Sequence, residues 1–174
     1  MTRVLVTEDS VVARALLVSI LNRDPGLEVV GEARDGEQAV KLAAELDPDV
    51  ITMDVHMPKV DGLEATRRIM GDTPKPIVVI SALDPSDVKL SVEALQTGAL
   101  AVLAKPSGPM APDFNERAAE IVRTVSTMAG VRVEAGDILL VRTGIHRSLS
   151  ESELLSLCAA CGGMPDFLAA AFTW

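Results

Sequence analysis

Aromatic residues are almost missing from this chain of 174 residues, which has three phenylalanines, one tryptophan and no tyrosine. Hydrophobic residues still make up 48% of the sequence, so the core must be built almost entirely from aliphatic side chains and methionine. This apolar content excludes an intrinsically disordered chain. A chain of this length can bury roughly two thirds of its unfolded surface, which suits one well-packed domain with a small appendage.

Positive charge is also scarce, because 16 lysines and arginines stand against 25 acidic residues and leave a net charge of −9. Binding to a phosphate backbone needs clustered lysine and arginine, and binding to single strands needs aromatic rings for stacking. The chain has neither feature. We therefore expect no nucleic-acid partner.

Cysteines and long hydrophobic runs are equally few. Two cysteines cannot form a disulfide framework and are typical of a reducing cytosol. The longest early apolar run, residues 15–21, is far too short to span a bilayer. Acidic residues also begin at Glu8, too early for the apolar stretch of a signal peptide. We expect a cytoplasmic protein without a membrane partner.

Up to about residue 130 the sequence alternates short apolar, mostly β-branched runs with longer helical patterns. The runs span residues 3–7, 28–33, 49–54, 76–81 and 99–104. Most are almost continuously apolar, as parallel strands covered on both faces are. The alternation predicts an α/β fold in three layers, with helices on both sides of one parallel sheet.

The predicted helices carry their own start signals. Three acidic residues have the spacing of a helix N-cap with its reciprocal partner, in the pairs Asp35 and Gln38, Asp61 and Glu64, and Asp113 and Glu116. Asp84 before Pro85 predicts one further helix start, and Gly130 should end the last helix.

Charged and polar residues follow the predicted strands at their carboxyl ends, where open parallel sheets place their sites. They are Glu8, Asp9, Asp54, Ser81 and Lys105. Three ionised carboxylates in one place repel one another, so either the pKa of one of them rises or a cation lies among them. Hard oxygen ligands on loops suit Mg²⁺. Asp54 would then be a nucleophile beside a Lewis acid, as formation of an aspartyl phosphate requires. Lys105 would neutralise one phosphoryl oxygen, and Ser81 would donate to another.

These residues resemble the receiver domain of bacterial two-component response regulators over about residues 2–130. The matching stretches are Glu8-Asp9-Ser10, Asp54-Val55-His56-Met57-Pro58, Asp61-Gly62, Ile80-Ser81-Ala82, Gly98-Ala99 and Lys105-Pro106. The resemblance implies a flavodoxin-like (βα)5 doubly wound sheet with strand order 2-1-3-4-5. It implies that residues 1–130 form the receiver and that residues 131–174 are a short C-terminal extension.

The same resemblance implies the roles of the site residues. Asp54 would be the phosphoacceptor, and Mg²⁺ would be held by Glu8, Asp9, Asp54 and the backbone carbonyl of His56. Ser81 and Lys105 would be the switch residues that bind the phosphoryl group. A histidine kinase would supply that group, and a downstream protein would bind the face formed by the fourth helix, the fifth strand and the fifth helix.

Among receivers, the chain is most like those that head the chemotaxis protein-glutamate methylesterases, through residues 50–58, 61–64 and 105–108. Two departures are clear. Receivers usually carry an aromatic residue three positions before the lysine, where this chain has Val102. Methylesterases continue into a catalytic domain with a Gly-x-Ser-x-Gly turn, which this chain lacks.

The leading hypothesis is therefore a phosphorelay switch that is not itself an enzyme. The alternative is a truncated methylesterase without its catalytic domain. An aspartyl phosphatase is disfavoured, because that class needs an acid two residues after its nucleophile and His56 stands there.

Residues 131–174 carry no convincing catalytic motif, and a truncated or fused gene could leave such an extension. A triad built on His146 lacks a strained serine turn, so we predict no catalytic triad. Cys158 and Cys161 invite a zinc or redox interpretation, but further soft ligands are missing. We expect them to be small residues on the packing face of a helix.

Overall fold

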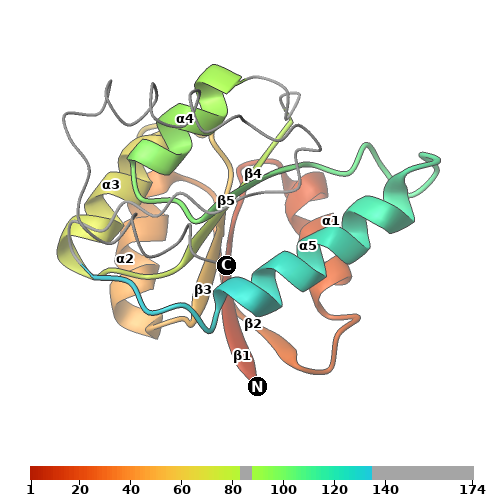
Figure 1. Cartoon of the computed structure of the whole chain (residues 1–174), viewed down its shortest axis with the longest axis horizontal. Helices are drawn as coiled ribbons and strands as arrows, with labels where there is room; N and C mark the ends of the chain where they lie inside the picture. The colour runs from red at the N-terminus through yellow and green to blue at the C-terminus, as the bar shows by residue number, and fades with distance from the viewer. Residues whose placement is uncertain (83–87, 135–174) are drawn as a thin grey trace, which may run out of the picture. The chain divides into compact units, whose positions relative to one another are not determined.

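The computed structural model describes residues 1–82 and 88–134, with the side chains of residues 88–90 excepted. The helix start predicted at Asp84 and Pro85 lies outside these ranges, as does almost all of the predicted extension, with His146, Cys158 and Cys161. Within the described ranges, five strands alternate with five helices along the chain (Figure 1).

The strands are β1 (Thr2–Thr7), β2 (Leu27–Ala33), β3 (Val50–Met53), β4 (Ile77–Ser81) and β5 (Ala101–Ala104). The helices are α1 (Val11–Leu21), α2 (Gly36–Leu46), α3 (Gly62–Asp72), α4 (Val88–Gln96) and α5 (Phe114–Met128). The strands form one parallel sheet in the order β2-β1-β3-β4-β5. This order confirms the predicted flavodoxin-like fold, and each strand was predicted to within two residues of its bounds.

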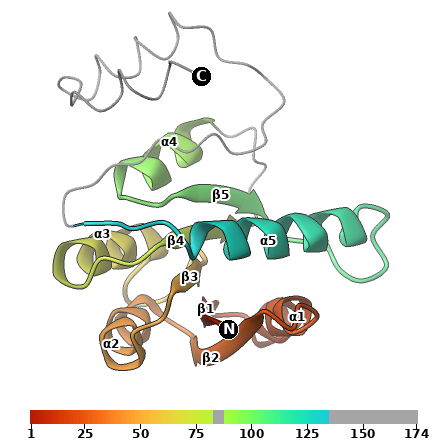
Figure 2. The same ribbon diagram turned by 60° about the horizontal axis from the view of Figure 1, so that its bottom comes forward.

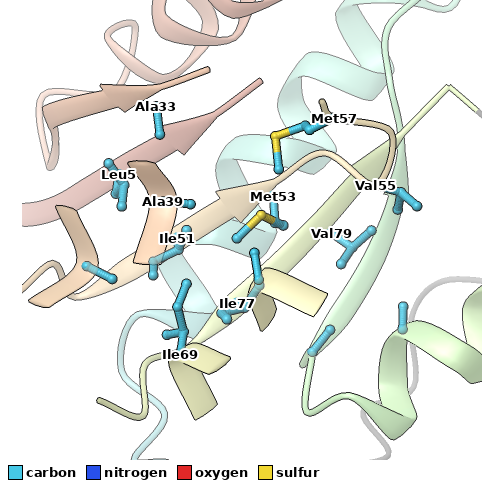
Figure 3. Packing of buried hydrophobic residues seen from close by; sticks show 14 of the residues in the cluster. Leu5, Ala33, Ala39, Ile51, Met53, Val55, Met57, Ile69, Ile77 and Val79 are labelled. Atoms are coloured by element: carbon cyan, nitrogen blue, oxygen red, sulfur yellow. The ribbon is translucent and has the colours of Figure 1, made fainter. Parts of the chain in front are cut away.

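Two aliphatic clusters hold the layers together. On one face of the sheet, α1 and α5 pack over β1, β3, β4 and β5, and the ring of Phe114 is buried there. On the other face, α2, α3 and α4 cover a second cluster, to which the described part of the chain contributes no aromatic side chain (Figures 2 and 3). Val102 belongs to this second cluster and is 7% exposed. At about 25 cal/mol per Å² of buried apolar area, such clusters supply most of the driving force for folding.

Two of the three predicted capping pairs are confirmed. Asp35 accepts a hydrogen bond from the Gln38 amide at 2.9 Å, and Asp61 accepts one from the Glu64 amide at 2.8 Å. Both caps have the extended backbone that lets the side chain turn back onto the first helical turn.

The predicted cap at Asp113 is wrong. Its backbone lies at φ −91° and ψ 0°, close to a helical conformation, and its side chain makes no capping hydrogen bond. The carboxylate instead pairs with Arg117 one turn later in α5. The tight turn before α5, in which the Phe114 amide bonds to the Ala111 carbonyl, sets this backbone conformation.

After α5 the chain crosses to the other face of the sheet. Val133 packs against the cluster formed by α2, α3 and α4, although α5 itself belongs to the opposite face (Figure 1). Among the helices in residues 1–82 and 88–134, none has the length and apolar character needed to cross a bilayer.

An acidic site at the carboxyl edge of the sheet

Three carboxylates lie together where β1 and β3 end. The two strands are parallel neighbours, with Thr7 opposite Met53, so the residues that follow them meet at one edge. One carboxylate oxygen from each of Glu8, Asp9 and Asp54 lies within 4.8 Å of the others. Glu8 and Asp54 are 1% and 3% exposed, whereas Asp9 is open to solvent. The cluster is therefore buried at its base and accessible from one side.

Lys105 reaches this cluster from the end of β5. Its Nζ atom lies 2.6 Å from Glu8 Oε2 and 3.0 Å from Asp54 Oδ2, and its side chain is 16% exposed. Burial by itself would lower the pKa of Lys105, but the contacts with Glu8 and Asp54 outweigh burial, and the pKa is raised above its usual value. Lys105 is therefore a positive charge held against two carboxylates.

Glu8 is a buried acid whose pKa is raised. Burial raises its pKa above the ordinary 4.5, and the close contact and charge of Lys105 only partly offset this effect. Glu8 Oε1 accepts a long hydrogen bond of 3.3 Å from the Ser10 amide. Glu8 Oε2 has only the short ion pair with Lys105 and no well-directed hydrogen bond among the described residues.

This donor set fits a hard divalent cation. Three carboxylates on two loops, two of them buried and one open to solvent, match the oxygen ligands that Mg²⁺ takes while it keeps several waters. A cation there would also relieve the mutual repulsion of the acids, which Lys105 relieves in part.

Ser81 and His56 occupy different positions at the same edge. Ser81 ends β4, is fully buried, and accepts a hydrogen bond on its backbone oxygen from the Lys105 amide at 2.8 Å. The His56 side chain is exposed and does not join the acidic cluster of the described residues. Only the backbone of His56 is therefore available to the site, two residues after Asp54.

The first turn of α3 presses directly on the backbone of Asp54. A Cβ atom on Gly62 would lie 1.9 Å from the Asp54 carbonyl oxygen, so no other residue fits there without a backbone shift. The Gly62 amide also donates to the Val55 carbonyl at 2.9 Å. The sequence predicts Asp61 as a helix cap and the Asp61-Gly62 pair as part of the receiver resemblance, but it does not predict this contact with Asp54.

A second contact on the β3–α3 loop was missed by sequence reasoning. Lys59 has a left-handed backbone with φ 66°, and its Nζ lies 2.7 Å from Oδ2 of the buried Asp35. The hydrogen bond from Lys59, followed by that from the Gln38 amide, holds the pKa of Asp35 below its usual range. Asp35 thus caps α2 and anchors the loop that follows Asp54. The two residues are 24 positions apart, so spacing along the chain carries no signal for the pair.

Comparison with known proteins gives a consistent result. The family model described as "response regulator receiver domain" matches residues 4–111. The chain is 55% identical over 131 residues to a protein-glutamate methylesterase/protein-glutamine glutaminase of Myxococcus xanthus, and 53% identical to one of Anaeromyxobacter dehalogenans. Each match covers 75% of this chain but only 37% and 38% of the relative.

Solved structures agree with these relatives. The response regulator domain of Thermotoga maritima CheB superimposes with a TM-score of 0.70 and 38% identity, covering 76% of this chain and 98% of that domain. A complex of the P1 domain of CheA3 with CheY6 from R. sphaeroides matches with a TM-score of 0.63 and 30% identity, covering 75% of this chain and 98% of the other. The predicted likeness to methylesterase receivers is therefore confirmed, and the chain belongs to the response regulator receiver family.

Proposed function

We propose that this receiver accepts a phosphoryl group on Asp54 from a phosphohistidine of a histidine kinase. A carboxylate oxygen of Asp54 forms the new bond to phosphorus, the phosphorus–nitrogen bond breaks, and the imidazole of the kinase leaves with the electron pair. The observation that carries the proposal is the position of Asp54, which is 3% exposed and lies between two further carboxylates and a lysine.

Mg²⁺, when bound, would screen the charge of the incoming phosphoryl oxygens from the acids of the site. Glu8, Asp9 and Asp54 would hold it with their carboxylates, and His56 with its backbone carbonyl. The burial of Glu8 and Asp54 and the close approach of their carboxylates to that of Asp9 support this assignment.

Lys105 and Ser81 would respond to the new group. Phosphorylation adds a charge of about −2 and three strong acceptor oxygens. Lys105 already lies 3.0 Å from Asp54 Oδ2 and would shift its contact to a phosphoryl oxygen. Ser81, at the end of the next strand, would donate its hydroxyl to another phosphoryl oxygen.

The output surface would be the face of α4, β5 and α5, which we propose binds a downstream protein. Val102 on β5 is buried opposite Val79 and replaces the usual aromatic residue of receivers. The response at this face would therefore travel through the backbone and packing of β4 and β5 rather than through a rotating ring.

The decisive test is labelling with acetyl phosphate and Mg²⁺, read by intact mass. We expect the wild type to gain one phosphoryl group and Asp54→Asn to gain none. Asp61→Asn is the matched control, since Asp61 is an exposed acid on the same loop. Labelling of the Asp54→Asn protein at the wild-type rate would contradict the assignment.

A chemotaxis-type kinase is the proposed phosphodonor. The similarity to methylesterases and to a CheY6 bound to the P1 domain of CheA3 supports this choice. Transfer of radioactive phosphate from a purified phosphorylated kinase domain, compared between wild type and Asp54→Asn, would test it. A cytoplasmic location and the absence of a nucleic-acid partner remain parts of the same proposal.

A separate assay tests the alternative of a truncated methylesterase. The chain spans little more than a third of the methylesterases that it matches, so it could correspond to their receiver without the catalytic part. We propose that residues 1–130 act as the receiver and residues 131–174 as a separate extension without enzymatic activity. Hydrolysis of a glutamyl methyl ester by the 174-residue chain would contradict this view.

A further inference from the structure

Arg14 makes three contacts around the acidic loop between β1 and α1. Its Nη1 donates to the Glu8 carbonyl at 2.8 Å and to the Asp9 carbonyl at 3.3 Å. Its Nε donates to Glu32 Oε2 at 3.0 Å. The Arg14 side chain is only 13% exposed, whereas Val12, two residues earlier, is 79% exposed. The guanidinium is thus a fixed part of the loop and not a free surface charge.

The two carbonyls belong to the residues that supply two of the three clustered carboxylates. Fixing a carbonyl fixes its peptide plane, and the peptide planes on either side of Asp9 set the direction of its Cα–Cβ bond. A planar guanidinium can bind several acceptors in one rigid geometry, which an ammonium group cannot do. Arg14 therefore fixes the backbone that directs the Asp9 carboxylate, together with the peptide plane that follows Glu8.

Glu32 anchors the other side of the guanidinium. It lies on β2, directly opposite Val6 of β1, so the anchor belongs to the sheet itself. Its carboxylate also balances the charge of Arg14, which limits any repulsion between Arg14 and a cation in the acidic cluster. The geometric effect of Arg14 on the loop should therefore exceed its electrostatic effect on the cation.

We propose that Arg14 is a positioning residue that holds the Glu8–Asp9 loop in the geometry needed to bind a divalent cation. This inference rests on the proposed function, because the acidic cluster is its target. It means that α1 contributes a side chain that orients metal ligands on the loop before it. Groups that orient metal ligands typically contribute a factor of about 10–100 to metal affinity.

The test compares Mg²⁺ binding by calorimetry, without any phosphodonor, in wild type and variants. We expect Arg14→Gln to bind Mg²⁺ about tenfold more weakly. Arg14→Lys keeps the charge but cannot reach both carbonyls and Glu32, so we expect a loss of about threefold. Glu32→Gln keeps an acceptor and should change binding by about twofold or less. Arg68→Gln, an exposed position on α3, should bind like wild type.

A second readout separates positioning from general damage. The Mg²⁺ concentration for half-maximal labelling by acetyl phosphate should rise in Arg14→Gln about as much as the dissociation constant does. The maximal rate at saturating Mg²⁺ should stay within about twofold of wild type. The melting temperature without Mg²⁺ identifies any folding defect, and Arg14→Lys carries the test if Arg14→Gln does not fold.

Tighter Mg²⁺ binding in the Arg14 variants would overturn the proposal, because it would show that repulsion between Arg14 and the cation dominates. Unchanged binding would overturn it as well, because it would show that the Arg14 contacts have no effect on the cation site. The failure of the proposed function looks different. In that case the wild type binds Mg²⁺ and the Arg14 variants bind it more weakly, but Asp54 is not labelled in any of them.

Discussion

The two loops that bring carboxylates to the site are held in different ways. The β3–α3 loop, which follows Asp54, is fixed mainly by backbone packing, since Gly62 touches the Asp54 carbonyl and Gly36 donates to the Val60 carbonyl at 3.1 Å. The Lys59–Asp35 ion pair adds one side-chain anchor. The β1–α1 loop is held chiefly by side chains, since Arg14 donates to the Glu8 and Asp9 carbonyls and the Glu8 carboxylate accepts from the Ser10 amide. Damage to the first loop should therefore reduce the stability of the fold, and damage to the second should reduce ligand affinity.

The largest expected effect is that of Gly62→Ala on the β3–α3 loop. The new methyl group would lie 1.9 Å from the Asp54 carbonyl oxygen, so α3 or the loop must move. We expect a loss of about 3 kcal/mol or more in the free energy of unfolding, measured in urea. Gly71→Ala in the same helix is the control, because nothing lies within 4 Å of its Cβ position. It should stabilise the protein by about 0.5–1 kcal/mol. Equal stability of the two variants would contradict the packing account.

Lys105→Met removes a side chain that contacts acids of both loops, Glu8 and Asp54. Its loss leaves Glu8 and Asp54 buried without a cation, and we expect about 1–3 kcal/mol lower stability in the absence of divalent ions. Mg²⁺ should stabilise this variant more than the wild type, since Lys105 no longer occupies the same carboxylates. Lys41→Met, on an exposed pair of α2, should change stability by less than about 0.5 kcal/mol. An equal response of Lys105→Met and wild type to Mg²⁺ would show that Lys105 and the ion do not compete.

Asp35→Ala removes the side chain that caps α2 and anchors Lys59. We expect a loss of about 1–2 kcal/mol from the cap, seen as a lower urea midpoint with an unchanged slope. Asp61→Ala removes a cap of the same kind without such an anchor on a second loop. The difference between the two losses in unfolding free energy therefore measures the contribution of the Lys59–Asp35 ion pair. A smaller loss for Asp35→Ala than for Asp61→Ala would exclude a stabilising contribution from that pair.

The smallest predicted effect is a pH dependence of the same anchor. The folded-state pKa of Asp35 lies below its ordinary value of 3.8, so its charge stabilises the fold above the unfolded-state pKa. This contribution is lost as the pH falls through the lower folded-state value. Asp35→Asn keeps a capping oxygen but no charge, so its deficit against wild type should be constant between about pH 5 and pH 7 and vanish in acid. A deficit that persists undiminished in acid would argue against the ion pair.

Local patterns in the sequence were enough for the sheet and for the position of the site. Apolar runs predicted the five strands, and the residues that follow their carboxyl ends predicted the cluster of Asp54, Glu8 and Asp9. This works because parallel strands bring equivalent ends to one edge whatever the details of packing. The same reasoning could not find the contacts of Arg14 with Glu32 or of Lys59 with Asp35, which join residues 18 and 24 positions apart.

The three capping pairs show where local reasoning ends. Asp35, Asp61 and Asp113 have the same spacing to a partner, but the turn before α5 gives Asp113 a near-helical backbone and sends its carboxylate to Arg117. The sequence by itself determined the strands, their parallel order through the family resemblance, and which acids meet. Only the tertiary structure decided how the two loops are held, because close backbone contacts and buried ion pairs depend on which distant segments the fold brings together.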